Sequence, residues 1–433
     1  MRPALLAALV VVLGAGAVAV VLATGGTEGR GPGERGPNLW VDRDGGGCVR
    51  RAAPAPYVDG EACSLEDAYR RAGSGDVVFI RAGRYPQAEI GPDNENLDQS
   101  VTMRPAEGAR VTLAGLVTAG SRLTLRDVTI ATEGRHRRGW ISQDASHVRL
   151  DGVDITGPWA NLRIEGGEGN AYANASFGTP GNTEPRVCGQ GDGEPLELTR
   201  TKGMTISNVD FQPFHPDRDN PLCGPDDVQH LETIRVNEGV DDLLLERSRF
   251  HRGDGSGTAR LFVTKLEPAG AGQNSNRIRV VNNWFGAAEG TTSILLGENQ
   301  VCAGYVFAYN LWEGGFDDAC RKDGPDSLTF IGNEGTQPAY LPCPGTTAGH
   351  NQWTWSEGRT DCGTDQWAID PCNCLDGLAL AGDGFHLTAA SPAVDAGQPE
   401  EECKRLTGGV DIDGEPRRGT CDAGPDELAT EGR

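Results

Sequence analysis

Four residues whose side chains can transfer protons or neutralise charge lie near one another in the middle of the chain. His230, Glu232 and Arg235 belong to the stretch QHLETIRV, and Lys265 belongs to the later stretch LFVTKL. A histidine or lysine can act as a general base, and an arginine can neutralise a carboxylate. We therefore predict a catalytic cluster at these four positions. The structural alternative is a hydrogen-bonded network that stabilises a turn.

Two aspartates precede this cluster and extend its set of oxygen ligands. Asp226 and Asp227, together with Glu232, would offer the hard carboxylate oxygens that Ca²⁺ prefers. We predict a calcium site at these three residues, with an acidic surface loop as the alternative. The stretch DIDGE at residues 411–415 lacks the full spaced ligand set of a calcium loop, so we interpret it as a turn.

A repeated pattern of alternating apolar residues surrounds the cluster. Each copy begins with a polar or small residue and contains a small or polar central pair, often with Asn or Asp. The copies occupy residues 121–130, 146–155, 202–211, 241–250, 276–285, 303–312 and 326–335. Their central apolar residues are Leu125, Leu150, Ile206, Leu245, Val280, Phe307 and Phe330. The spacings are 25, 56, 39, 35, 27 and 23 residues, which indicates a base period of roughly 22–27 residues with insertions.

The alternation predicts short β-strands, and the period predicts how they stack. Asn and Asp tolerate left-handed backbone, so the central pair of each copy is expected to bend the chain between two strands. A third strand fits between copies, at residues 232–236, 260–264 and 293–296. Three strands per coil predict an all-β fold, a right-handed parallel β-helix whose coils share one core. A β-sandwich would not repeat one strand–turn–strand signature at a fixed phase.

Alternation also assigns faces to the strand that carries Glu232. Ile234 and Val236 are expected inside, and Arg235 outside. Glu232 shares the inward parity, so we expect either a bulge that turns it outward or a position at the edge of the coil. Because an unpaired buried carboxylate is costly, Glu232 is expected to pair with His230 or Arg235.

Both ends of such a stack need cover. At the start, Ser64 and Asp67 resemble a capping box ahead of an apolar helical stripe, and Asp76 opens the first coil. We therefore predict an N-terminal capping helix. We assign residues 39–335 to the β-helix with this cap, and residues 336–427 to a disulfide-rich C-terminal cap.

The chain has 12 cysteines, which suits an oxidising compartment outside the cytoplasm. Cysteines close in sequence are predicted to form disulfides, namely Cys48–Cys63, Cys188–Cys223, Cys302–Cys320, Cys343–Cys362 and Cys403–Cys421. Cys372 and Cys374 are expected to bridge to different partners. Zinc is a weaker alternative, because no Cys-x2-Cys pair accompanies a His-x3-His run.

The first residues have the pattern of an export segment. Arg2 precedes an apolar run at residues 4–23, and Val21-Leu22-Ala23 offers a small-residue cleavage site. This run is also long enough to span a bilayer, so residues 1–23 are either a signal peptide or a membrane anchor, followed by a linker at residues 24–38. Both alternatives place the remaining chain outside the cytoplasm, either secreted or tethered to the outer face of the cytoplasmic membrane.

The charge of the chain excludes one class of partner. Its 39 basic and 62 acidic residues give a net charge of -23. Nucleic-acid binding depends on clustered Lys and Arg, so no nucleic-acid partner is expected. The same charge argues more weakly against unaided binding of acidic polymers. We expect a monomer.

Several longer stretches carry a family resemblance. They are GDVVFIRAGRY, GFHLTAASPAVDAG, DIDGEPR and DAGPDE near the two ends, and DDVQHLETIRV, RLFVT, NNWFG and FAYN in the middle. Together they resemble exported bacterial right-handed β-helix proteins of the pectin-lyase-like fold, with the middle similar to an actinobacterial subgroup. The resemblance covers residues 39–427 and implies the fold. It selects no activity, because this fold hosts lyases, hydrolases, epimerases and adhesins.

A finer resemblance links the middle of the chain to the alginate lyase and chondroitinase B family. In that family a GE-T/S-IR strand is followed one coil later by a strand ending in a catalytic Lys, and a further coil carries a catalytic Arg. LETIRV is similar to the first piece, and Lys265 would take the position of the lysine. The third piece differs, because SILLGEN offers Leu296 near the position of the arginine.

The loops before the strand of Glu232 complete the functional prediction. Two Gly- and Pro-rich loops, at residues 166–195 and 212–227, are expected to wall a groove beside it. The rings available there to stack on sugars are Tyr172, Phe177, Phe214 and His215. We predict an exported enzyme that acts on extracellular polysaccharide. It would be a lyase with Lys265 or His230 as base, or a hydrolase with paired carboxylates at Glu232 and Asp227. The alternative is a non-catalytic glycan-binding or structural surface protein.

Overall fold

The computed structural model divides the chain into residues 1–35 and a unit from Gly36 to Arg433. The predicted signal or anchor segment lies in the first part, outside the described residues. The structure describes residues 36–92, 94, 97–132, 139–157, 162–178, 196–213, 232–252, 259–264, 273–286, 292–297, 300–318, 320–322, 327–335, 339–342, 346–354, 367–368, 373–375 and 379–428. Within these ranges, no helix combines the length and the apolar character needed to cross a membrane.

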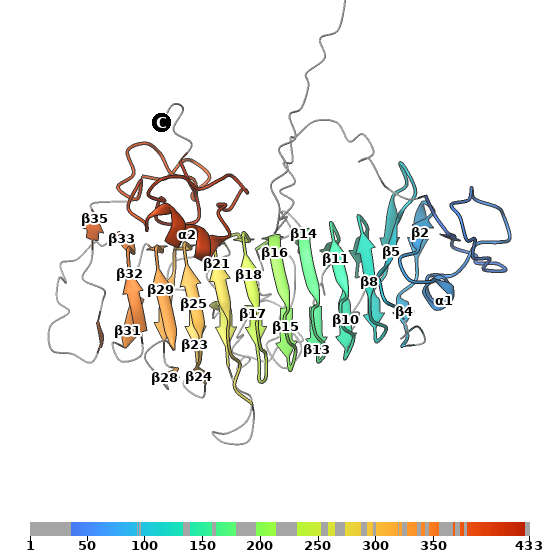
Figure 1. The fold of residues 1–433 in the computed structure, drawn as a ribbon, viewed down its shortest axis with the longest axis horizontal. Coiled ribbons are helices and arrows are strands. Elements are labelled where there is room, and N and C mark those ends of the chain that lie inside the picture. Colours follow the sequence, from blue (N-terminus) through green and yellow to red (C-terminus); the bar gives the residue numbers. More distant parts are fainter. Residues whose placement is uncertain are drawn as a thin grey trace, which may run out of the picture. The chain divides into compact units, whose positions relative to one another are not determined.

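The unit from Gly36 onward is a right-handed parallel β-helix, in which strands pair with their equivalents in the next coil (Figure 1). Each complete coil contributes one strand to each of three rows, and the rows run along the stack. The first row consists of β1 (Leu39–Val41), β2 (Val77–Ile80), β5 (Val101–Pro105), β8 (Leu123–Arg126), β11 (Arg149–Asp151), β14 (Ala171–Phe177), β16 (Thr205–Phe211), β18 (Leu244–Glu246), β21 (Arg279–Val281), β25 (Tyr305–Ala308), β29 (Leu328–Ile331) and β32 (Thr346–Gly349).

The second row follows the first after a tight turn, and both rows belong to one 22-stranded sheet. It consists of β3 (Gly83–Tyr85), β6 (Val111–Leu113), β9 (Thr129–Ala131), β12 (Asp154–Thr156), β19 (Arg249–Phe250), β22 (Trp284–Phe285), β26 (Leu311–Trp312), β30 (Glu334–Gly335), β33 (Gln352–Thr354) and β35 (Asn373–Leu375). The seven-residue strands β14 and β16 run through both rows. The parallel pairings reach β35, so the coils continue beyond residue 335, where the sequence predicted their end.

The third row forms a separate 11-stranded sheet. It consists of β4 (Ala88–Ile90), β7 (Leu116–Thr118), β10 (Trp140–Gln143), β13 (Leu162–Glu165), β15 (Leu196–Thr199), β17 (Glu232–Val236), β20 (Ala259–Val263), β23 (Thr292–Leu296), β27 (Gly315–Asp318), β31 (Ala339–Pro342) and β34 (Trp367–Ala368). The last of these strands, β34, pairs antiparallel with β31. A short pair, β24 (Val301–Cys302) and β28 (Arg321–Lys322), lies outside both sheets. The three predicted third strands are β17, β20 and β23, which are neighbours in this sheet.

The central apolar residues of the predicted repeat form the core beneath the first row. All seven central apolar residues are at most 2% exposed, and they pair in register from coil to coil. One member was overlooked, because Tyr172 pairs with both Leu150 and Ile206 and fills the gap of 56 residues between them. The central turns also behave as predicted. Left-handed backbone follows the first row at Asp127, Asn174, Asn208 and Asn282, and also at Arg247 and Tyr309.

A column of buried asparagines runs behind these turns in the later coils. Asn283, Asn310, Asn333 and Asn351 stack so that each Nδ2 donates at 3.0 Å to Oδ1 of the next. Each amide also donates to a carbonyl oxygen of the first row, as Asn310 does to Val280 at 2.8 Å. The column satisfies backbone and side-chain groups that the core would otherwise leave unpaired, at a cost of about 1–3 kcal/mol each.

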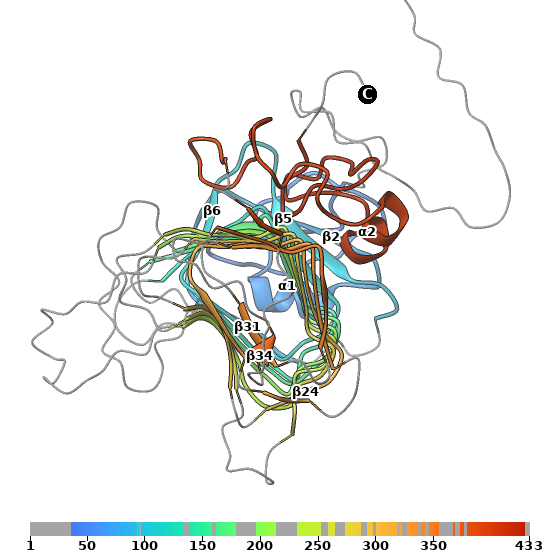
Figure 2. The same cartoon turned by 90° about the vertical axis from the view of Figure 1, so that its left-hand side faces the viewer.

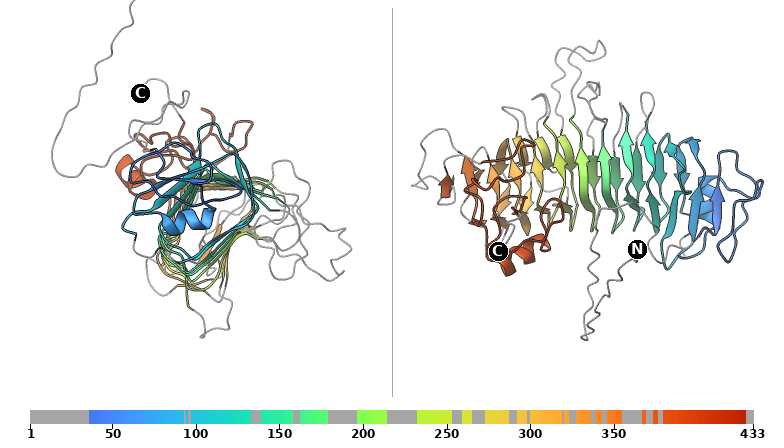
Figure 3. Two further views of the ribbon diagram at one scale, coloured as in Figure 1. Left: turned by 90° about the vertical axis from the view of Figure 1, so that its right-hand side faces the viewer. Right: turned by 90° about the horizontal axis from the view of Figure 1, so that it is seen from above.

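The N-terminal helix confirms the predicted cap. Helix α1 (Leu65–Arg71) begins after Ser64, whose hydroxyl accepts the Asp67 backbone N–H at 3.1 Å. Its apolar stripe is buried, and the view from the N-terminal end shows α1 lying across the first coils (Figure 3). Tyr69 reaches further along the stack, because its hydroxyl donates to the carbonyl oxygen of Ser121 at 2.5 Å.

The C-terminal segment at residues 379–428 lies on the outer side of the later coils (Figure 2). Its helix α2 (Glu400–Thr407) packs through Cys403 and Leu406 onto Val281, Ala308 and Ile331. A second contact joins Phe385 and Ile412 of this segment to Trp284 and Leu311. The segment therefore packs on the outer faces of rows one and two in these coils.

Three predicted disulfides are confirmed and staple separate parts of the fold. Cys48–Cys63 closes the N-terminal loops, Cys302–Cys320 links consecutive coils, and Cys403–Cys421 holds the C-terminal segment. The other predicted pairs, Cys188–Cys223 and Cys343–Cys362, involve residues outside the described ranges.

Candidate functional site

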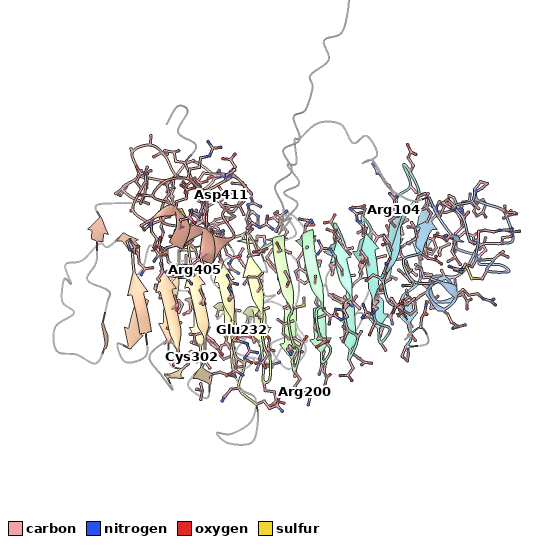
Figure 4. The ribbon with its side chains drawn as sticks, viewed as in Figure 1. Arg104, Arg200, Glu232, Cys302, Arg405 and Asp411 are labelled. Carbon is pink, nitrogen blue, oxygen red and sulfur yellow. A yellow bond between two sulfur atoms is a disulfide. The ribbon has the colours of Figure 1, made fainter. Side chains whose placement is uncertain are left out.

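Strand β17 places two of the predicted site residues in the middle of the third row. Ile234 and Val236 are fully buried and Arg235 is half-buried, as alternation indicated. Glu232 is the first residue of the strand and is only 2% exposed (Figure 4). Glu232 and Arg235 each have an interaction partner, so neither side chain is free.

The outward residues of row three form a line across neighbouring coils. Arg163, Glu197, Arg235, Phe262 and Leu295 lie in register on adjacent strands, which are about 4.8 Å apart. Arg163 Nε lies 3.8 Å from Glu197 Oε2. The guanidinium carbon of Arg235 lies 5.9 Å from the ring centroid of Phe262, which is within cation–π range. This line offers an apolar ring beside a cation.

The starts of the third-row strands are more enclosed than this line. Thr233, Arg260 and Ser293 have outward parity, yet each is at most 9% exposed. Arg260 donates from Nε to the carbonyl oxygen of Gly286 at 2.9 Å. Gly286 follows the second-row strand β22, so Arg260 bridges the corner where row two ends and row three begins.

A second pair of titratable groups lies at the row-two side of this corner. The Nε2 atom of His251 lies 2.5 Å from Oδ1 of Asp210, which belongs to the preceding coil. Gln212 donates from Nε2 to the other oxygen of Asp210 at 3.1 Å. The imidazole also meets the Trp284 ring edge-on, with centroids 5.5 Å apart. The sequence prediction missed this pair, although aligning VDFQ with SRFH in two repeat copies places Gln212 beside His251.

The groups on both sides of the corner come from the same two coils. Strands β16 and β17 carry Asp210, Glu232 and Arg235, whereas the next coil, from β18 to β20, carries His251 and Arg260. Adjacent coils are one strand spacing apart, so these groups occupy one level of the stack. We call Asp210, Glu232, Arg235, His251 and Arg260 the corner site.

Two predicted ligand-binding residues lie in the core instead, and the prediction for them is wrong. Tyr172 and Phe177 are fully buried. The Tyr172 hydroxyl donates to the carbonyl oxygen of Ser176 at 2.9 Å, and Phe177 packs against Phe211 with centroids 5.8 Å apart. Both occupy inward positions of the coil that was overlooked, so neither ring can stack on a sugar. The remaining predicted site residues lie outside the described ranges, namely Phe214, His215, Asp226, Asp227, His230 and Lys265.

Another cluster lies in the C-terminal segment, where His386, Asp413 and Asp426 offer ligand atoms within 4.8 Å of one another. His386 directs Nδ1 at Asp383 and Nε2 at Asp413, the latter at 2.6 Å. Burial alone would lower the pKa of His386, but the Asp383 and Asp413 carboxylates outweigh it and raise this pKa to about 9. Calcium takes oxygen ligands, so a cluster centred on a protonated imidazole does not fit it. The arrangement is an ion-pair network.

These features define the class of protein as a right-handed parallel β-helix protein with charged groups at one corner of its middle coils. No family model matches the chain, and no curated protein matches it.

Several solved structures are similar to the chain. Pectate lyase Pel9A is 12% identical with a TM-score of 0.44, covering 91% of this chain and 96% of its own. An alginate lyase from Paenibacillus sp. str. FPU-7 is 16% identical with a TM-score of 0.40, covering 66% and 95%. A rhamnogalacturonan lyase is 12% identical with a TM-score of 0.38, covering 73% and 87%. Similarity at this level carries no argument about activity, which depends on the residues of this chain.

Proposed function

We propose that this is an exported protein that binds an extracellular uronate-containing polysaccharide across the corner site and cleaves it by elimination. The carrying observation is the placement of Arg235, a half-buried cation beside the Phe262 ring and on the same strand as the buried Glu232. An apolar ring next to a cation suits a sugar whose ring has an apolar face and whose substituent is a carboxylate.

Elimination is favoured over hydrolysis by the state of the carboxylates on this face. A hydrolase needs two carboxyl groups that flank the glycosidic bond. Among the described third-row side chains within two strands of Arg235, Glu165 pairs with Arg200, Glu197 accepts a hydrogen bond from Asn237, and Glu232 is buried. Asp317 is exposed, but it lies three strands from Arg235, at about 14 Å along the row. A lyase instead needs a cation against the uronate and a base for the C5 proton. Arg235 would supply the cation. Lys265 and His230 are predicted bases, and Asp226 with Asp227 and Glu232 would hold calcium.

Export is part of the same proposal. Three disulfides within the described residues suit an oxidising compartment. We propose that residues 1–23 direct export, either as a cleaved signal or as a tether, and that residues 24–38 link them to the β-helix. Residues 336–427 would then provide the last coils together with the C-terminal segment.

A second candidate is a glycan-binding protein without catalysis. One observation favours it, because charges on the outer line partly neutralise one another. Arg163 lies 3.8 Å from Glu197, which also accepts a hydrogen bond from Asn237 at 2.8 Å. Such a face would hold a polymer without offering it a reactive pair.

The experiment separates the two candidates. Purified protein is incubated with polygalacturonate, alginate and a neutral glucan, with and without calcium, while unsaturated uronate absorbance, reducing ends and binding are followed. We expect new ultraviolet absorbance on a uronate polymer and about tenfold weaker binding by Arg235→Ala. Arg149→Ala, which removes an exposed arginine of β11 on another face, should bind normally. Binding without any cleavage would leave the second candidate, and no binding across the panel would overturn both.

A further inference from the structure

We infer that His251, oriented by Asp210, is the proton-accepting group of the corner site. The inference rests on the proposed function and assigns to His251 the role of base that the sequence analysis gave to Lys265 or His230. The two nitrogens of this histidine have different surroundings. Nε2 lies 2.5 Å from the Asp210 carboxylate. Nδ1 has no hydrogen-bond partner among the described residues, and the side chain is 35% exposed. One nitrogen is therefore anchored, and the other has no partner among the described residues.

The carboxylate behind the imidazole is itself held in place. Gln212 donates to Oδ2 of Asp210 at 3.1 Å, which leaves Oδ1 directed at His251. A fixed carboxylate selects the tautomer with the proton on Nε2, so Nδ1 carries the lone pair. The same carboxylate stabilises the imidazolium that forms when Nδ1 takes up a proton.

The imidazole ring is also fixed from the other side. It meets Trp284 edge-on at an interplanar angle of 87°. Trp284 is 4% exposed and lies against Phe385 of the C-terminal segment, with centroids 5.2 Å apart. The ring therefore rests on a packed aromatic surface, which limits its rotation.

The other charges that face this pair are already matched. Arg249 pairs with Asp413 at 2.5 Å, and Arg252 forms an ion pair with Glu313. Within the described ranges, His251 is the basic side chain that contacts Asp210.

The elimination acts on a uronate chain held by Arg235. Nδ1 of His251 takes the C5 proton, and the C5–H electron pair becomes the C4=C5 double bond. The C4–O4 bond breaks, and its electron pair stays on the leaving glycosyl oxygen. That oxygen receives a proton from water, and the resulting hydroxide takes the proton from His251. Atoms and charge balance without any oxidant or reductant.

The test compares variants of the full exported chain on polygalacturonate and alginate. His251→Gln can still donate to Asp210 but cannot accept a proton. We expect its kcat to fall at least about 100-fold with KM nearly unchanged. Asp210→Asn should lower kcat and move the acidic limb of the pH–rate profile. Arg235→Ala should chiefly raise KM. The control is His147→Asn, which changes an exposed histidine at a left-handed turn position that Asn tolerates.

A readout independent of turnover accompanies the kinetics. Imidazole NMR signals assigned through His251→Gln should shift when uronate oligosaccharides are added, whereas those of His147 should not. Retention of kcat within about twofold in His251→Gln would overturn the inference and leave the proposed function intact. Oligosaccharide binding that leaves the His251 signals unmoved would do the same. If no uronate polymer binds the wild-type protein, the proposed function fails, and this inference fails with it.

Discussion

Arg417 donates a hydrogen bond from Nη2 to Oδ1 of Asn282 at 3.0 Å, although 135 residues separate them. Asn282 is the left-handed turn residue of a middle coil, and its amide in turn donates to the carbonyl oxygen of Val410 at 2.7 Å. Arg417 is fully buried and also donates to the backbone carbonyls of Gly424 and Pro425. This pair of residues fastens the C-terminal segment to the stack.

Replacing Arg417 with Met should therefore release the segment. The change leaves several buried acceptors without a donor, so we expect a loss of roughly 3–5 kcal/mol in unfolding free energy. The segment should also become cleavable in native-state proteolysis. The exposed neighbouring change Arg418→Met serves as the control and should alter neither measurement. Equal stability of the two variants would contradict a fastening role.

Glu334 is a buried acid whose replacement should stabilise the protein. It is fully buried, and neither carboxyl oxygen has a hydrogen-bond partner in the described chain. Burial, and then the carboxylates of Asp426 and Asp422, raise the pKa of Glu334 well above 4.5. A raised folded-state pKa contributes stability that is present below pH 4.5 and is lost as the pH rises.

Glu334→Gln should remove the loss of folding stability that Glu334 causes at neutral pH. We expect the variant to unfold at a higher temperature than wild type at neutral pH, by an equivalent of about 1–3 kcal/mol, and at a similar temperature at acid pH. The exposed Glu415→Gln is the matched control and should behave as wild type at both pH values. A destabilised Glu334→Gln protein at neutral pH would show that the carboxylate has a stabilising partner.

The His386 network predicts a second dependence on pH. Its pKa is about 9 in the folded chain against 6.5 ordinarily, so its stabilising contribution is complete below pH 6.5 and is lost as the pH rises through 9. Thermal unfolding measured across this window should show the loss in wild type. It should be smaller in His386→Gln, which cannot form the two ion pairs. If wild type and His386→Gln lose the same stability across this pH window, the network is not the cause of the pH dependence.

The asparagine column should be sensitive to a single truncation. In Asn310→Ala, the Oδ1 atom that accepts from Asn283 and the Nδ2 atom that donates to Val280 and Asn333 are both lost. We expect a loss of roughly 2–4 kcal/mol in urea unfolding, because buried partners stay unpaired. The control Asn208→Gly removes an exposed amide while keeping a left-handed turn. If Asn310→Ala lowers the free energy of unfolding no more than Asn208→Gly does, the asparagine column does not contribute the expected stability.

The fold was largely predictable, because every coil buries the same position of the repeat. Leu150 and Ile206 were correctly placed in the core, yet the coil between them was not recognised. Its strand reads AYANASF. The alanines weaken the alternating apolar pattern, and the core position is a tyrosine, whose hydroxyl is polar. Tyr172 was consequently interpreted as a surface ring, although its hydroxyl is satisfied by a backbone carbonyl inside the coil.

The candidate site was less predictable, because it depends on register between coils. Arg235 could be assigned to the outer face from alternation alone. The pairing of Asp210 with His251 spans 41 residues and requires the exact offset of consecutive coils, which the long insertion before Glu232 obscures. The bridge from Arg260 to Gly286 likewise joins two rows whose mutual angle no local pattern encodes.

The first strand has an implication for assembly. In β1, the outer backbone edge is already occupied, since the Cys63 N–H donates to the Trp40 carbonyl oxygen at 2.8 Å and the Asp42 N–H donates to the Cys63 carbonyl oxygen at 3.2 Å. The disulfide from Cys63 to Cys48 secures that cover. An uncovered coil would present a template onto which another molecule could add strands without limit. A reduced protein stripped of this staple is therefore the form in which end-to-end polymerisation into fibres would begin.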